Sequence, residues 1–208
     1  MASWSAENAT KAYLQTLKMG KGENEPDAAE FISALAAGNN KKLMVTACAG
    51  TAGSIILALV AAAHQTGGRV VCILPGPNEL QASQSALGHH ARCIEFVVGD
   101  AETLLSKDYK SGDFILVDCN INNLKGVLVV AQRAVSHGGA LVVGYNARHE
   151  GSWLSELKAQ FLPIGEGLMV AKTAAGRRIG GGGEKKSHWV VEIDKHTGEE
   201  HFFRITSP

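Results

Sequence analysis

Two apolar runs that each end in a polar residue constrain the fold of this chain more than any other feature. The first covers residues 113–118 and ends in Asp118, and the second covers residues 138–146 and ends in Asn146. Residues 121–137 between them have the length and pattern of a helix. A strand–helix–strand unit places both polar residues at the carboxyl edge of a sheet, where open α/β sheets bind ligands. A carboxylate there predicts a cofactor or metal site, and an amide in place of a second carboxylate indicates that its chemistry has changed or been lost.

Runs of strand length alternate with helical patterns along most of the chain. The further strands are expected at residues 43–47, 70–74, 93–98 and 167–173. The further helices are expected at residues 4–18, 27–38, 53–64, 79–87, 102–105 and 153–161, with Asp27 as an N-cap. Strands that alternate with helices predict a mostly parallel sheet with helices on both faces.

The C-terminal part has a different composition. Residues 177–187 hold four consecutive glycines between basic residues, which favours a mobile loop, and they lack the phosphate-loop spacing GxxxxGK[ST]. Residues 188–193 and 200–205 are rich in β-forming side chains and predict a hairpin. We expect a single domain over residues 1–208, made of N-terminal helices (1–40), a core sheet (41–173), the Gly-rich loop (177–187) and the hairpin (188–206).

Composition excludes several classes of partner. The 20 basic and 20 acidic residues balance, so neither a nucleic acid nor a membrane surface is an expected partner. No apolar run has the length of a membrane-spanning helix, and no secretory signal is visible at the N-terminus. The four cysteines show no CxxC spacing and lie in or beside apolar runs, which is typical of free thiols in a reducing compartment. We therefore expect a cytoplasmic protein.

The loop after the first expected strand is the second candidate ligand site. Residues 46–54 are almost all small, and a helix begins after them, so a ligand could approach the backbone and the positive end of the helix. Such a loop is a weak signal alone, since about half of such loops only pack a helix on a strand. The dinucleotide fingerprint GxGxxG is absent, which disfavours a nicotinamide-dependent oxidoreductase.

Other polar residues have simpler structural interpretations. Asp118 could cap a helix or lie in a loop at the end of its strand. His89 and His90 are expected on a solvated turn, without a third ligand at metal-binding spacing. Cys48, Cys72 and Cys119 fall near strand ends and could cluster at the carboxyl edge, but small buried thiols are favoured because no neighbouring base activates them.

The residues around Asp118 resemble the caffeoyl-CoA-type O-methyltransferases. The resemblance rests on the motifs at residues 113–118, 138–139 and 144–146, and on Leu-Pro-Ile-Gly-Glu-Gly at residues 162–167. Residues 4–13, 67–69 and 72–75 are closer still to a plant family of unknown function classed as methyltransferase-like. The resemblance spans about residues 4–173 and leaves out the hairpin. It implies a class I methyltransferase (Rossmann-like) fold, with seven strands and an antiparallel strand at residues 167–173.

The resemblance also implies an S-adenosylmethionine site. The serine that opens the helix, the alanine on the adenine side and the aspartate of the fourth strand are kept as Ser54, Ala101 and Asp118. The acid that anchors the cofactor falls on Thr46, and the acid that binds the ribose hydroxyls falls on Leu74. The complete set of expected cofactor-binding residues is Thr46, Cys48, Gly50, Ser54, Leu74, Asp100, Ala101 and Asp118.

Departures from the family pattern predict a degenerate site. The other two metal ligands of the family fall on Asn146 and Ala147, so a divalent cation would lose one charge and one ligand, and we expect no metal. Leu74 would leave two ribose hydroxyls unpaired at about 1–3 kcal/mol each, which lowers affinity by roughly one to four orders of magnitude. Glu79 or Asn78 could replace the missing acid.

The sequence therefore favours a methyltransferase-like protein that uses S-adenosylmethionine, with weak or absent catalysis on a small molecule. Any methyl transfer would be cation-independent and driven by positioning. The candidates for a catalytic role are Asp118, Tyr145 and His149. The alternative is a non-catalytic nucleoside-binding or scaffold protein on the same fold. Whether the chain is an enzyme, and whether it forms a homodimer, the sequence leaves open.

Overall fold

The computed structural model describes residues 4–20, 28–134, 141–147, 159–172, 187–193 and 200–206. The chain divides into two compact units, residues 1–176 and 177–208. We describe each unit by itself, and the assignment of the whole chain to one domain stays a prediction.

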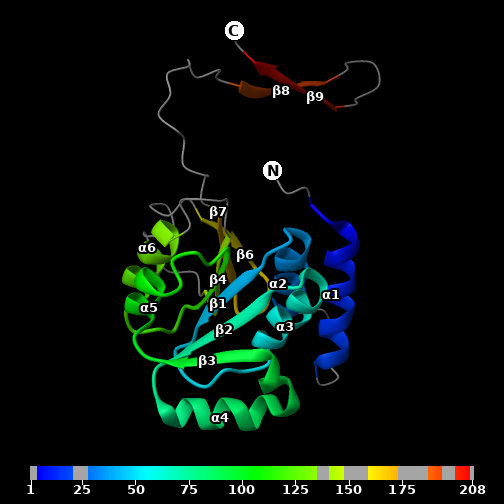
Figure 1. Ribbon diagram of the computed structural model, residues 1–208. Coiled ribbons are helices and arrows are strands. Elements are labelled where there is room, and N and C mark those ends of the chain that lie inside the picture. The colour runs from blue at the N-terminus through cyan, green and yellow to red at the C-terminus, as the bar shows by residue number, and fades with distance from the viewer. Residues whose placement is uncertain are drawn as a thin grey trace. The chain divides into compact units, whose positions relative to one another are not determined.

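A seven-stranded sheet forms the centre of the first unit (Figure 1). The strand order is β3-β2-β1-β4-β5-β7-β6. Strands β1 to β5 are parallel, whereas β7 is antiparallel to β5 and β6 is antiparallel to β7. The predicted class I methyltransferase-like fold, with an antiparallel strand near residues 167–173, is confirmed. The strands are β1 (Leu43–Ala47), β2 (Arg69–Leu74), β3 (Ile94–Val98), β4 (Phe114–Asp118), β5 (Leu141–Tyr145), β6 (Gln160–Leu162) and β7 (Leu168–Lys172).

Helices cover both faces of this sheet. Helices α1, α2 and α3 pack on one another on one side, and α5 and α6 lie together on the other (Figure 1). The helices are α1 (Ala6–Met19), α2 (Ala28–Gly38), α3 (Ile55–Thr66), α4 (Pro77–Leu87), α5 (Ala101–Lys107) and α6 (Leu124–Ala134), with a short 3-10 helix η1 (Gly88–Cys93) after α4. None of the helices in the described ranges is long and apolar enough to span a bilayer.

Two hydrophobic cores follow from the alternation of side chains along the central strands. Met44 and Phe114 point into the core beneath α2 and α3, and Val45 and Ile115 point into the core beneath α5 and α6. All four side chains are fully buried. Strands buried on both faces read as continuous apolar runs, which is why the sequence located them well.

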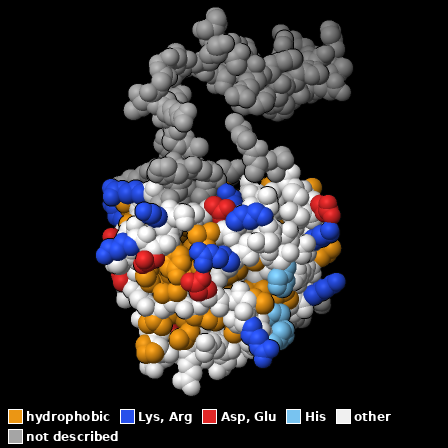
Figure 2. All heavy atoms as spheres, viewed as in Figure 1, with side chains coloured by type: hydrophobic (Ala, Val, Ile, Leu, Met, Phe, Trp, Pro, Cys, Tyr) orange, Lys and Arg blue, Asp and Glu red, His pale blue; other side chains and the backbone are white. Residues whose placement is uncertain are grey.

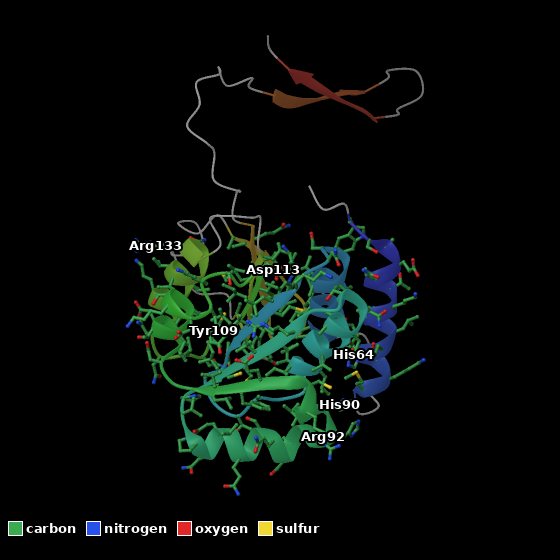
Figure 3. The ribbon with its side chains drawn as sticks, in the orientation of Figure 1. His64, His90, Arg92, Tyr109, Asp113 and Arg133 are labelled. Carbon is green, nitrogen blue, oxygen red and sulfur yellow. The ribbon has the colours of Figure 1, made fainter. Side chains whose placement is uncertain are left out.

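Asp113 fixes the amino edge of the sheet, opposite the edge where the strands end. Its carboxylate accepts hydrogen bonds from the backbone N–H groups of Lys42, at 2.9 and 3.1 Å, and of Leu43, at 2.9 Å. These bonds join the start of β4 to the start of β1. Figure 3 shows Asp113 in this part of the molecule.

Two predicted elements differ from the structure. The helix expected at residues 153–161 is wrong at its end, because Gln160–Leu162 form strand β6, and its earlier residues lie outside the described ones. His89 and His90 lie in η1 rather than on a turn. The expected cap Asp27 and the Gly-rich residues 177–186 also lie outside the described residues.

The second unit contains an antiparallel hairpin of β8 (Ser187–Ile193) and β9 (Glu200–Thr206). Its register pairs Val190 with Phe203. The hairpin predicted from the sequence is confirmed.

Candidate functional site

The carboxyl ends of the strands are tied together by backbone hydrogen bonds beyond the sheet itself. The N–H of Cys48 donates to the carbonyl of Ile73 at 3.1 Å, and the N–H of Gly99 donates to the carbonyl of Leu74 at 3.0 Å. On the other side, the N–H of Cys119 donates to the carbonyl of Tyr145 at 2.9 Å. These hydrogen bonds fix the first residues of the loops that follow the strands at this edge of the sheet.

Asp118 lies at the centre of this edge and is half-buried. One of its oxygens, Oδ1, accepts from Nδ2 of Asn146 at 3.0 Å and from the N–H of Asn120 at 3.1 Å. Its Oδ2 accepts a longer bond, 3.4 Å, from the N–H of Ala49 in the loop after β1. The structure thus brings together Asp118 and Asn146, the pair expected from the sequence. Because a carboxylate can only accept, the amide nitrogen of Asn146 must face it.

The backbone around Asn146 explains why an amide is tolerated here. Asn146 has φ 55°, in the left-handed region that asparagine adopts more readily than most residues. The next residue, Ala147, is buried and its N–H donates to the carbonyl of Gly167 at 3.0 Å. Ala147 therefore contributes a backbone clamp to β7 and no side-chain ligand.

Asp118 and Asn146 as they are paired here do not fit a divalent cation. Hard cations require several oxygen ligands, and here one carboxylate faces an amide nitrogen. No group of three or more His, Cys, Asp or Glu side chains with metal-binding geometry occurs within the described ranges. Among the described histidines, His64 of α3 and His90 of η1 lie on the same side of the molecule (Figure 3), and Figure 2 shows histidines beside basic side chains there.

Tyr145, a candidate catalytic residue, is poorly suited to act as a base. Its hydroxyl lies near Asp118 and Cys48. Burial raises the pKa of Tyr145 far above its usual value, and the neighbouring Cys48 and Asp118 raise it further. The phenol is therefore protonated at neutral pH. His149, the other candidate beyond Asp118, lies outside the described residues.

Two of the cysteines meet below the loop after β1. The sulfurs of Cys48 and Cys72 are 3.7 Å apart, and Oγ1 of Thr46 lies 3.9 Å from the Cys48 sulfur. A hydrogen bond with Cys72 lowers the pKa of Cys48, and the same contact together with burial raises the pKa of Cys72. Burial, then the charge of Asp118, raises the pKa of Cys119 to about 12. Cys119 is therefore a thiol at neutral pH, as expected of a half-buried cysteine without an activating base.

The remaining expected cofactor residues fall into two groups. Space is open beside the α-carbon of Gly50, and Ser54 is exposed and makes no capping bond to α3. Asp100 is exposed and caps α5 by accepting from the N–H of Thr103 at 2.7 Å, which lowers its pKa, and Ala101 is the buried first residue of that helix. Thr46 and Leu74, in contrast, are fully buried and their side chains belong to the interior.

Sequence reasoning missed the residue that joins the β1 loop to α4. Oγ of Ser83 accepts from the N–H of Ala52 at 2.8 Å and donates to the backbone carbonyl of Glu79. Ser83 is fully buried, so this bond fixes the loop against the helix. A serine on the apolar side of a predicted helix was the available signal, since buried hydroxyls require a partner.

Solved structures with the same fold come from methyltransferases. A methyltransferase from Geobacter sulfurreducens is 19% identical, with a TM-score of 0.56 over 82% of this chain and 92% of that one. An O-methyltransferase from Bacillus cereus in complex with SAH is 15% identical, with a TM-score of 0.56 over 82% and 92%. A candidate caffeoyl-CoA O-methyltransferase from Staphylococcus aureus is 16% identical, with a TM-score of 0.55 over 82% and 93%. At these identities the likeness establishes the fold alone.

Comparison by sequence places the chain in a family. No curated protein matches it. Residues 1–205, which include both compact units, match the family described as protein of unknown function (DUF1442). The chain belongs to that family.

Proposed function

We propose that this protein binds S-adenosylmethionine or a related nucleoside at the carboxyl edge of its sheet, without a metal ion, and that methyl transfer to a small molecule is slow. The observation that carries the proposal is the hydrogen bond from Asn146 to Asp118. Through this bond the carboxylate of Asp118 has the neutral amide of Asn146 as its partner, in place of a cation.

Several groups of this chain would hold the nucleoside. The loop after β1 offers open space at Gly50 and the exposed hydroxyl of Ser54. Asp100 and Ala101 would lie on the adenine side, and Asp118 would accept from the ammonium group. When bound, S-adenosylmethionine supplies a methyl group on a positively charged sulfur. These residues bind and orient, and the braced strand ends keep them in place.

Slow transfer is expected because the side chains beside Asp118 are poor general bases. The phenol of Tyr145 is held in its protonated form, and the thiol of Cys119 has a pKa of about 12. The carboxylate of Asp118 is occupied by three donors. Catalysis would rest on positioning an acceptor that is already nucleophilic.

A binding protein without transfer activity is the second proposal. The buried Leu74 favours it, since no carboxylate lies at the end of β2 itself. In this case the nucleoside would act as a bound signal or structural ligand. All four cysteines are free thiols, which is typical of a reducing compartment and supports a cytoplasmic location in either case.

Isothermal titration with S-adenosylmethionine and S-adenosylhomocysteine tests the proposal. We expect binding of equal affinity in EDTA and in millimolar Mg²⁺. The variant Asp118→Ala should weaken it roughly 10-fold or more, because a charged hydrogen bond is lost. Asp108→Ala, at an exposed position of the amino edge, is the matched control and should bind as the wild type does. Binding that needs Mg²⁺, or no heat at millimolar ligand, would contradict the proposal.

A further inference from the structure

The end of β2 lacks a polar side chain at the position where a ribose would need one. Leu74, the last residue of β2, is fully buried in the core beneath α3. A ribose brought to this edge has two neighbouring hydroxyl groups that require an acceptor. The turn after β2 and the start of α4 follow this position directly in the chain.

Glu79, in the first turn of α4, extends back over this turn. Its Oε2 lies 2.6 Å from the position that a β-carbon on Gly76 would occupy. Gly76 has φ −160°, an extended conformation open to any residue, so the backbone does not require glycine here. A side chain at residue 76 would displace the Glu79 carboxylate, which is the end of a flexible side chain and would move away from the turn.

The carboxylate of Glu79 has no partner within the described part of the chain. The backbone carbonyl of Glu79 accepts a hydrogen bond from the hydroxyl of Ser83, and this bond does not involve the carboxylate. A half-buried carboxylate beside this turn, without a donor, is available to a ligand.

The position of Glu79 relative to the proposed nucleoside loop is fixed by two bonds. Ser83 joins α4 to the loop through the N–H of Ala52. The carbonyl of Leu74 accepts from Gly99, which joins the end of β2 to the residues before Asp100 and Ala101. Glu79 therefore belongs to a turn that is braced to both the β1 loop and the end of β3.

We infer that Glu79 is the residue that accepts the 2′- and 3′-hydroxyl groups of the bound nucleoside, in place of an acid at the end of β2. The inference rests on the proposed function and names a binding residue for it. One carboxylate can accept from two neighbouring hydroxyls, so the site would select nucleosides with an intact ribose diol.

A purely structural role for Glu79 is the competing explanation. Glutamate at this position of a helix can reach back to the N–H of the cap residue, here Gly76. If Glu79 has only this role, its replacement changes the stability of the protein and weakens all ligands equally. The experiment must therefore vary protein and ligand together.

Titration of S-adenosylhomocysteine and its 2′-deoxy analogue into wild type and Glu79→Gln provides that test. We expect Glu79→Gln to weaken the intact nucleoside roughly 10- to 100-fold and the deoxy analogue much less. Gly76→Ala should weaken the intact nucleoside similarly, and the double variant should add little. Glu7→Gln, in the first turn of α1, is the charge-matched control and should bind as wild type does.

The outcomes separate the inference from the proposed function. Wild-type binding that Glu79→Gln leaves unchanged, or equal weakening for both ligands, overturns the inference and leaves the proposed function in place. No binding by the wild type overturns both. Thermal melts of each variant confirm that the compared proteins are folded.

Discussion

At the scale of single residues, the hydrogen bond between Asn146 and the carboxylate of Asp118 defines the candidate site. The sequence identified Asp118 and Asn146 and placed them at the same edge, because strand ends of a parallel sheet must meet there. It did not reveal that the amide donates directly to the carboxylate at 3.0 Å. That contact depends on the left-handed backbone of Asn146, which no local pattern specifies.

Asn146→Asp should convert this contact into a repulsion. Two carboxylates would then face each other, and we expect the protein to lose about 1–3 kcal/mol of stability in EDTA. Millimolar Mg²⁺ should recover part of the loss, while the wild type melts identically in Mg²⁺ and EDTA. Asn78→Asp, exposed in the first turn of α4, is the control for added charge. A wild-type melt that rises with Mg²⁺ would show that the pair binds metal as it stands.

The cysteines should differ sharply in reactivity. Cys93 is exposed, Cys48 and Cys72 are buried, and the pKa of Cys119 is about 12. Iodoacetamide at neutral pH should therefore modify Cys93 alone in the native protein, and Cys93→Ser should abolish the reaction. Mass spectrometry after digestion identifies the modified site. Rapid modification of Cys48 would contradict its burial, and rapid modification of Cys119 would contradict its raised pKa.

At the scale of elements, the brace between the β1 loop and α4 is the feature that sequence could not supply. Ser83→Ala should leave the N–H of Ala52 buried without a partner, at about 1–3 kcal/mol. Ser85 offers a matched control on the same helix, since its hydroxyl is exposed and bonds only to the carbonyl of Gln81. Urea unfolding should show a large loss for Ser83→Ala and a change within about 0.5 kcal/mol for Ser85→Ala. Equal losses of stability for Ser83→Ala and Ser85→Ala would show that the hydrogen bond between Ser83 and Ala52 does not stabilise the protein.

Asp113 tests the register between β1 and β4 in the same way. Asp113→Ala removes the acceptor for two backbone N–H groups, and we expect a loss of about 1–3 kcal/mol. Asp108→Ala, at an exposed position nearby, should change stability little. If Asp113→Ala leaves the free energy of unfolding in denaturant unchanged, water replaces these hydrogen bonds at no cost.

Helices and strands were predicted correctly where buried apolar residues define the pattern, and the prediction failed where they do not. Strands β1, β2 and β4 carry runs of apolar residues between short loops, which leave little choice of structure. Strand β6 is three residues long and pairs only with β7, so its pattern could not be told from the end of a helix.

The direction in which a side chain points could not be predicted from the sequence pattern either. The sequence suggests that Leu74→Asp would restore a ribose acceptor, but the side chain of Leu74 points into the core and Asp there would bury a charge.

At the scale of the whole molecule, the topology was predictable from resemblance and the site only in part. The sheet order β3-β2-β1-β4-β5-β7-β6 confirms the class I methyltransferase-like fold that the resemblance implies, and the resemblance does not include the hairpin of the second unit. The loop of small residues, Asp100, Ala101 and Asp118 follow strands β1, β3 and β4 at one edge. Glu79 and Ser83, on α4, enter the account through the structure alone.

Hydrogen exchange measured by mass spectrometry tests the central claim most directly, because it reports whether, where and without which ion the nucleoside binds. With saturating S-adenosylhomocysteine in EDTA, we expect slower exchange in peptides covering residues 48–54, 76–80 and 99–101. Peptides covering residues 108–113, at the amino edge, should exchange as in the free protein. Protection confined to other segments, protection that appears only with Mg²⁺, or none at millimolar ligand would contradict a metal-independent nucleoside site at the carboxyl edge.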